Sequence, residues 1–224
     1  MARTTIREED ITSGAVPTTG IVGVSTFTAS GTWTKTTREA ALGVTIKRVI
    51  VEVQGAGGAG IRSTTAGSRN GGGGGGYAKK LLDVSSIPSA TITIGSGGAG
   101  STSIDTKGGD GGDSIWSDGT NTITGSGGTA ATPSSGNYLT GEGGAATGGD
   151  LNVAGQAGGS NLGNDRGGAS VLGIEGCLQW NSSRASAQNG TFGAGGSHAY
   201  GNWPAGGQAG NGGDGIVIVW EIAG

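Results

Sequence analysis

The sequence predicts an all-β protein in which short β-strands bracket a bundle of glycine-rich extended segments with long loops. Two segments, 46–54 and 215–222, carry apolar residues at every second position along one face and are rich in β-branched residues, as strands are. Between them lie most of the 54 glycines of this 224-residue chain. We expect the two segments to belong to one sheet, which would tether the glycine-rich body at both ends.

The remaining elements follow from local patterns. Residues 36–42 can form one or two helical turns, and no later stretch offers a capped amphipathic helix. Strands are expected at 81–84 and 91–94, on either side of a turn near Pro88. Two further strands, 114–116 and 121–124, flank Asp118-Gly119, a dipeptide typical of tight hairpins.

The glycine spacing suggests how the body packs. Glycine recurs every third residue at 190, 193 and 196, and again at 207, 210 and 213. A polyproline II helix has three residues per turn and no internal hydrogen bonds, so such spacing leaves one bare face for a neighbouring segment. We therefore expect polyproline II- or polyglycine II-like segments that exchange backbone hydrogen bonds. Collagen is excluded, because the chain has 4 prolines and a broken period; a flexible glycine linker is the alternative.

Composition and charge exclude several functional classes. The formal net charge of −3 gives no basic face for nucleic acid. The longest strongly apolar run, 216–220, is too short for membrane insertion, and the first residues do not resemble a signal peptide, which suggests synthesis in a cytoplasm. One cysteine and one histidine exclude a disulfide framework and a His/Cys metal cluster within one chain.

Motifs for cofactors and metals occur but lack their structural context. Residues 55–60 satisfy the G-x-G-x-x-G pattern after a strand, yet the glycines at 71–76 leave no room for the helix that a dinucleotide site requires. Residues 108–116 match a single copy of a calcium-binding nonapeptide that works only in tandem. We expect no cofactor and no metal.

Catalytic residues are not indicated either. His198 has no Ser–Asp pattern near it, and Glu142, Asp150, Asp165 and Glu175 lie in polar glycine-rich loops where turn formation is their usual role. A pair of carboxylates for glycoside hydrolysis has no further support. The sequence therefore predicts a protein that is not an enzyme.

The sequence resembles the glycine-rich adhesins and tail-fibre tip proteins of tailed bacteriophages. Three segments carry this resemblance: 31–34 with 49–58, 71–80 with 92–95, and 212–219. The resemblance implies a receptor-binding protein of the virion that holds variable loops on glycine-rich extended helices and attaches to a bacterial surface receptor, a protein or a glycan. Residues 31–224 would form this adhesin domain.

Residues 1–30 depart from that family and look like the extended leader with which many fibre proteins attach to the virion; a disordered terminus is the alternative. The expected partners are therefore other virion tail proteins, and the chain is expected to form a homotrimer.

Receptor contacts are expected in three glycine-poor islands that contain aromatic and amide side chains: 129–140, 171–192 and 197–204. The candidate receptor-binding residues are Tyr138, Trp180, Asn181, His198, Tyr200 and Trp203. Packing of Trp180 and Trp203 beneath the loops is the alternative for these two.

Two other functions remain open at this point. The chain could be a structural fibre or decoration protein of the virion without a receptor role. An ice-binding protein would need a regular array of Thr or Ala on a flat face, which these tryptophan-containing loops do not offer.

Overall fold

A computed structural model describes residues 20–63, 70–134, 137–159, 166–177, 187–200 and 207–224. The strands are β1 (Gly20–Phe27), β2 (Gly31–Thr34), β3 (Ile46–Gln54), β4 (Arg62–Ser63), β5 (Tyr77–Asp83), β6 (Ser89–Thr93), β7 (Ser114–Ser117), β8 (Thr122–Gly125), β9 (Thr132–Ser134), β10 (Asn137–Leu139), β11 (Ala146–Thr147), β12 (Leu151–Val153), β13 (Ala199–Tyr200) and β14 (Ile216–Ala223), and the helix α1 spans Lys35–Leu42. The protein is thus almost entirely β, as the sequence predicts.

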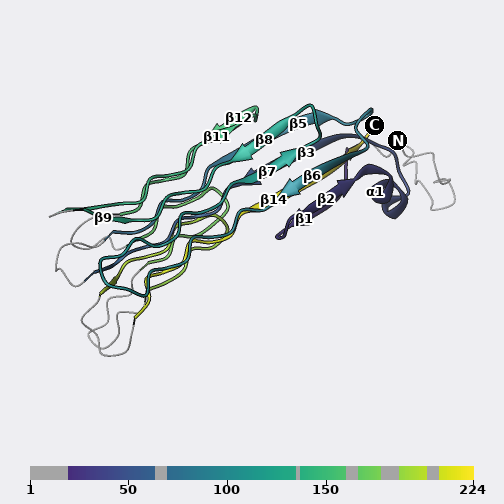
Figure 1. Cartoon of the computed structure of the whole chain (residues 1–224). Helices are drawn as coiled ribbons and strands as arrows, with labels where there is room; N and C mark the ends of the chain where they lie inside the picture. The colour runs from purple at the N-terminus through teal and green to yellow at the C-terminus, as the bar shows by residue number, and fades with distance from the viewer. Residues whose placement is uncertain (1–19, 64–69, 135–136, 160–165, 178–186, 201–206) are drawn as a thin grey trace, which may run out of the picture.

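Two five-stranded antiparallel sheets pack face to face at one end of an elongated molecule (Figure 1). Sheet A has the strand order β1-β14-β3-β5-β12, and sheet B has the order β11-β8-β7-β6-β2. The two strands predicted to bracket the glycine-rich body are β3 and β14, and they pair along their whole length, from Ile216 opposite Gln54 to Ala223 opposite Ile46. Their membership in one sheet is confirmed.

Side chains of both sheets form the core between them. Trp33 and Trp116 are almost completely buried, with ring centroids 5.5 Å apart. Around them lie buried β-branched and small residues, namely Val49, Val51, Val53, Ala78, Ala90, Ile92, Ile123, Val217 and Val219. Burying aromatic and aliphatic surface of this kind is the main stabilising contribution to a sandwich of two sheets.

The short local elements agree with the sequence. Helix α1 ends at Gly43, which adopts the left-handed conformation (φ 69°) and donates its N–H to the carbonyl of Glu39. Strands β7 and β8 form the predicted hairpin, and Gly119 in its turn has φ 89°. Strands β5 and β6, expected on either side of a turn, belong to different sheets, so this turn carries the chain from sheet A to sheet B.

Strand β1 moves the boundary of the folded domain. Residues 20–27, part of the expected leader, pair with β14 at the edge of sheet A, with Gly20 opposite Ala223. Residues 20–27 thus belong to sheet A, although the expected leader, 1–30, includes them.

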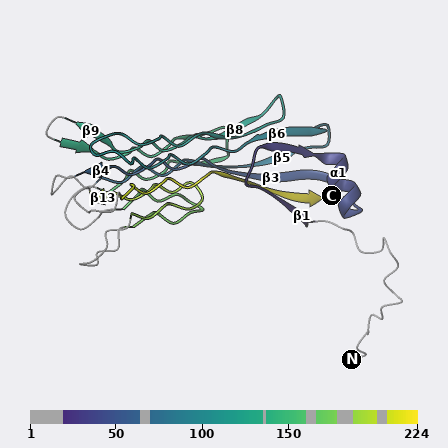
Figure 2. The ribbon, with the colours of Figure 1, turned by 60° about the horizontal axis from the view of Figure 1, so that its bottom comes forward.

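Beyond the sheets, the glycine-rich segments run side by side toward the opposite end (Figures 1 and 2). The backbone amides of the central segment, 55–61, donate to three neighbours in turn: those of 55, 58 and 61 to segment 70–76, those of 56 and 59 to segment 109–112, and those of 57 and 60 to segment 210–213. Its carbonyls accept from three other segments, which contain Gly98, Gly128 with Ala131, and Gly196 with Ala199. Successive residues thus donate to different neighbouring segments, and residues three positions apart donate to the same one. A helix with three residues per turn would give this pattern.

Segment 71–76 repeats this arrangement. Its amides donate in the same rotation to segments 156–159, 193–196 and 126–129. The approach is close enough to require glycine: a Cβ added at Gly58 would lie 2.1 Å from the carbonyl oxygen of Thr129, and one at Gly72 would lie 2.1 Å from that of Gly58. Below, segments 55–61 and 70–76, together with the segments that are hydrogen-bonded to them, are called the glycine bundle; these neighbours include 109–112, 126–131, 156–159, 193–199 and 210–213.

Candidate functional site: the loop-bearing end

The candidate site is the end of the glycine bundle opposite the sheets. Strands β4, β9 and β13 lie at this end, whereas α1 and the C-terminus lie at the other (Figure 2). Each of the three islands in which receptor contacts are expected includes or adjoins described residues at this end. We call the described residues that flank a segment outside the described ranges its anchors.

Backbone hydrogen bonds join these anchors. Strand β4 pairs in parallel with β13, which places Arg62 opposite Ala199 and Ser63 opposite Tyr200. The N–H of Ile61 donates to the carbonyl of Asn70, so the chain before residue 64 lies beside the chain after residue 69. The points where segments 64–69 and 201–206 leave the described structure are therefore next to each other.

Two further pairs of anchors belong to the same network. The amide of Gly159 donates to the carbonyl of Arg166, and Arg166 in turn forms a β-bridge with Cys177. The amide of Ser197 donates to the carbonyl of Gln188, and the amide of Gln188 donates to the hydroxyl of Ser197. Segments 160–165 and 178–186 thus also leave and rejoin the bundle at hydrogen-bonded positions.

The first island forms a hairpin on this end. Thr129 is hydrogen-bonded inside the bundle, and β9 and β10 follow, with Tyr138 opposite Pro133 in the β10–β9 pair. Leu139 on β10 is 60% exposed, so this hairpin presents apolar surface to solvent. The position of Tyr138 in a hairpin at the loop-bearing end is compatible with the predicted contact.

The second island, 171–192, is not one loop. The amide of Leu172 donates to the side-chain oxygen of Gln54, the last residue of β3, and Ser170 donates its hydroxyl to the carbonyl of Phe192. The two ends of this island, at Leu172 and Phe192, therefore lie near the end of β3, and residues 171–177 and 187–192 run along the bundle. Trp180 and Asn181 lie outside the described residues.

The third island is only partly at the surface. His198 is fully buried, with 0% exposure, in the run that precedes β13. The prediction that His198 contacts the receptor is therefore wrong for this structure, because its side chain lies in the interior of the glycine bundle. Tyr200 is the last residue of β13, and Trp203 lies outside the described residues.

Arg62, which the sequence does not mark as functional, connects two segments at this end. Arg62 donates from its guanidinium to the carbonyl of Thr102, and its own carbonyl accepts from the amide of Asp105. These contacts hold the 101–105 turn against β4. Ile104 in that turn is 44% exposed, which adds a second apolar side chain to the surface. A positive φ of 52° at Asp105 is the structural sign of this turn, and no spacing in the sequence predicts it.

The acidic residues considered for calcium and catalysis have structural partners. Asp110 accepts from the amide of Ala130 and pairs with Lys107 (2.8 Å), and Asp113 accepts from the amide of Gly127. Although burial alone would raise the pKa of Asp110, its bonds from Lys107 and Ala130 lower it below the ordinary value. These carboxylates thus satisfy backbone amides of the bundle.

Two of the other candidate acids, Asp150 and Glu175, also have partners. Asp150 accepts from the amide of Leu81 and from Lys80, and Glu175 pairs with Arg166 at 3.4 Å. The G-x-G-x-x-G segment is buried in the bundle, and the described residues that follow it, 61–63 and 70–76, are not helical. Within the described ranges, three or more His, Cys, Asp or Glu side chains do not gather as a metal site, and no helix is long and apolar enough to span a membrane.

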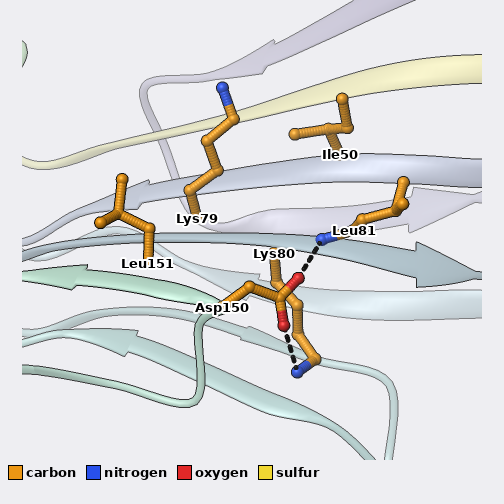
Figure 3. Close-up of a pocket in the computed structure, with 6 residues that line it drawn as sticks. All are labelled: Ile50, Lys79, Lys80, Leu81, Asp150 and Leu151. Carbon is orange, nitrogen blue, oxygen red and sulfur yellow. Dashed lines mark hydrogen bonds and ion pairs between the residues drawn. The ribbon is translucent and has the colours of Figure 1, made fainter.

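Two shallow hollows are found on the described surface, both away from the loop-bearing end. One, of about 280 Å³, lies at the junction of the sheets and the bundle beside Thr28, Phe192 and Asp214. The other, of about 270 Å³, lies on sheet A between Ile50, Leu81 and Leu151 (Figure 3). In the first, the carboxylate of Asp214 is engaged by the amide of Gly97.

Comparison with known proteins does not identify a family for this chain. Searches with protein-family models and among curated proteins find no match to the chain. The function is therefore argued from the fold and the site.

Proposed function

We propose that this chain is a bacteriophage tail-fibre adhesin that binds a receptor on the bacterial surface through loops at one end of the glycine bundle, without catalysis. The observation that carries the proposal is the polarity of the molecule. Gly20, where the described chain begins, lies opposite Ala223 near the C-terminus, and the loop anchors lie at the other end (Figure 1). One end can thus face the virion while the other faces the host.

The glycine bundle supplies the rigid support that this role requires. We infer that its segments are polyproline II- or polyglycine II-like helices, because amides of both central segments donate to three neighbours in rotation. A segment fixed by neighbours on all sides cannot move alone, so the loops are held at defined distances. Loops on a rigid scaffold are where binding residues are commonly found.

Within this proposal, the contacts come from the hairpin with Tyr138, from Tyr200 at the end of β13, and from Trp180, Asn181 and Trp203. Exposed Leu139 and Ile104 extend the apolar part of the surface. Aromatic side chains give a large contact area at low entropic cost, whether the receptor is a glycan or a protein. Virion localisation, attachment to other tail proteins through residues 1–30, and synthesis in the host cytoplasm belong to the same proposal.

The test is competition with phage adsorption by the purified chain. The wild type should block adsorption, and Trp180→Ala with Trp203→Ala should lose at least about tenfold in potency, since central aromatic contacts are often worth 2 kcal/mol or more, as an order of magnitude. Trp220→Phe on sheet A is the matched control and should block like the wild type. Circular dichroism of all three variants checks that they are folded.

A structural fibre protein is the second candidate, and the long bundle itself favours it, since a rigid rod could serve only as a spacer. If folded wild type at saturating concentration neither binds cells nor competes with phage, the adhesin proposal is abandoned and the spacer role takes its place. A normal freezing curve for the purified chain would dismiss ice binding.

A further inference from the structure

One large surface of the molecule is apolar and uncovered: the outer face of sheet A. In antiparallel pairs, directly opposite residues point to the same side of the sheet. The register places Val24, Trp220, Ile50 and Leu81 opposite one another, so they form one row across four strands. This row lies on the side away from sheet B, because the alternate residues Val219, Val51 and Leu82 are buried in the core.

The neighbouring rows extend the apolar face. One contains Ile21 and Ile222 and continues with Arg48 and Asp83; the other contains Ile218 and ends, through Glu52 and Lys79, at Leu151. Figure 3 shows Ile50, Leu81 and Leu151 on one side of the sheet, together with Lys79, whereas Lys80 points to the other side. The apolar members, which we call the outer patch, are Ile21, Val24, Ile50, Leu81, Leu151, Ile218, Trp220 and Ile222.

Much of the outer patch is exposed. Ile21 is 61% exposed, Val24 44%, Leu81 48% and Leu151 52%. Soluble monomers rarely present so many large apolar side chains in one contiguous area, and such areas usually mark a contact with another molecule. A sheet also normally buries both faces or keeps the solvent face polar, and sheet A does neither.

The charges of this face are already balanced within it. Lys79 and Glu52 form an ion pair with 3.1 Å between Nζ and Oε1, and Trp220 donates its indole N–H to the same oxygen at 3.1 Å. Arg48 lies opposite Asp83, whose pKa is lowered first by hydrogen bonds from Ser85 and further by the charge of Arg48. A partner therefore needs apolar surface with little net charge, which is the composition of this face itself.

We propose that the outer face of sheet A packs against the same face of a second copy of this chain. The four longer strands of sheet A have seven to nine residues. At about 3.3 Å per residue and about 4.8 Å between strands, they give a face of roughly 25 Å by 20 Å. Two such faces bury about 1,000 Å² together, which reaches the lower limit for a specific interface. This contact does not depend on the proposed receptor-binding role, because it lies at the opposite end from the loops.

The other occupant to consider is the chain before β1. This segment, residues 1–19, is joined to Gly20, which pairs with Ala223 at the edge of sheet A. Their large apolar residues are only Met1, Ile6, Ile11 and Val16, and 7–10 reads Arg-Glu-Glu-Asp. These four large apolar residues cannot cover the eight apolar side chains of the outer patch, which favours a second copy of the chain as the occupant.

Sedimentation velocity of the full-length chain between about 1 and 100 µM tests this, the range in which interfaces of modest area associate. The wild type should associate with concentration. Val24→Lys with Leu81→Lys brings like charges together across the contact and should raise Kd by at least about 100-fold. Val171→Lys with Ile174→Lys, which charges exposed apolar residues outside sheet A, is the control and should associate like the wild type.

Further variants keep the test decisive. If the lysine variant misfolds by circular dichroism, Val24→Thr with Leu81→Thr preserves strand propensity and should weaken association about tenfold. A wild type that stays monomeric at every concentration overturns the proposal, as does association that the patch variants leave unchanged. If only Ile6→Ser with Ile11→Ser and Val16→Ser makes the chain associate, then the leader covers the patch in place of the second copy.

Discussion

The sandwich and the glycine bundle of this chain are stabilised in opposite ways. In the sandwich, side chains fill the space between two sheets, and Trp33 and Trp116 alone occupy much of it. In the bundle, backbone lies directly on backbone, and most buried side chains are small, such as Ala56, Ala59 and Ala194, with Ile61 and His198 as larger exceptions. Hydrophobic burial dominates the first region, whereas the second depends on hydrogen bonds between segments in an interior with little apolar side-chain surface.

The difference teaches what each region tolerates. A side-chain core can adapt to a change of volume by moving neighbouring rotamers. A backbone core has nothing flexible to move, because the atom that meets an added Cβ is a carbonyl oxygen fixed by its own hydrogen bond. The bundle should therefore be the more sensitive region to the smallest side-chain addition, and the sandwich the more sensitive to deletion.

The largest effect is expected for Gly58→Ala in the bundle. The new Cβ would meet the carbonyl oxygen of Thr129 at 2.1 Å, so segment 55–61 and its neighbour must separate and several hydrogen bonds must lengthen. We expect a loss of about 4 kcal/mol or more in the free energy of unfolding, or failure to fold. Urea unfolding followed by circular dichroism measures it.

Gly207→Ala is the matched control for this prediction. No atom lies within 4 Å of a Cβ added there, so the free energy of unfolding should change by less than about 1 kcal/mol and can rise, because alanine restricts the unfolded chain. Equal losses at Gly58 and Gly207 would show that the close approach in the bundle does not determine which glycines are required.

The second effect concerns the sandwich. Trp116→Ala removes a fully buried indole packed 5.5 Å from that of Trp33, and should lower the free energy of unfolding by about 3–5 kcal/mol through the cavity left behind. Because β3 continues directly into segment 55–61, and segment 71–76 continues directly into β5, we expect the bundle to lose protection together with the sheets.

Amide hydrogen exchange of Trp116→Ala measures that coupling. If the amides of 55–61 exchange faster in parallel with those of β3, the two regions unfold as one unit. Bundle amides that keep wild-type protection while β3 opens would instead make the bundle an independently stable region. Trp116→Phe, which keeps an aromatic ring, should show a smaller loss and serves as the control.

The sequence predicts the sandwich better than the bundle, for physical reasons. Period-two spacing and β-branched residues in 46–54 and 215–222 identify β3 and β14 as strands, although in β14 the core side is that of Val217 and Val219. Segment 55–61 contains four glycines, which have no side chain to indicate direction, and its six neighbours come from distant parts of the sequence. Period-three glycine suggests the packing mode but cannot say which segments meet.

The candidate site follows the same division. Islands of aromatic residues indicate where loops could be, yet His198 is buried, and 171–177 runs along the bundle, because hydrogen bonds to partners far away in sequence fix both. Gly20–Phe27 was missed as a strand for a similar reason: β1 is an edge strand whose partner, β14, is almost 200 residues away. The role of Arg62 has no local signal at all.

The third prediction uses acid to weaken the sandwich through one buried carboxylate. Glu221 on β14 is fully buried and accepts hydrogen bonds from Ser25, from the indole of Trp33 and from Arg38 at 2.6 and 2.8 Å. Burial by itself would raise the pKa of Glu221, but the hydrogen bonds and the charge of Arg38 lower it below the ordinary value. Its folded-state pKa is thus below its unfolded one.

The sign of the pH dependence follows from that shift. The stabilisation is present above the unfolded pKa of about 4.3 and is lost as the pH falls through the lower, folded-state value. The free energy of unfolding should therefore decline below about pH 4. Glu221→Gln should cost about 3 kcal/mol at pH 7 and flatten this decline, because it leaves Arg38 without its carboxylate partner. An acid decline of unchanged steepness in Glu221→Gln would assign the effect to other carboxylates.

The smallest effect belongs to the rim of the bundle, where side chains replace missing backbone partners. Asp113→Ala removes the carboxylate that accepts from the amide of Gly127, and that amide is near enough to solvent for water to take over. We expect a loss of about 1 kcal/mol, the usual net value of one hydrogen bond, against about 4 for Gly58→Ala inside the same bundle. Asp113→Asn keeps an acceptor oxygen and should recover most of it in the same unfolding assay. If Asp113→Ala is as damaging as Gly58→Ala, then rim and interior form a single cooperative network, and the bundle depends on its capping side chains as much as on its glycines.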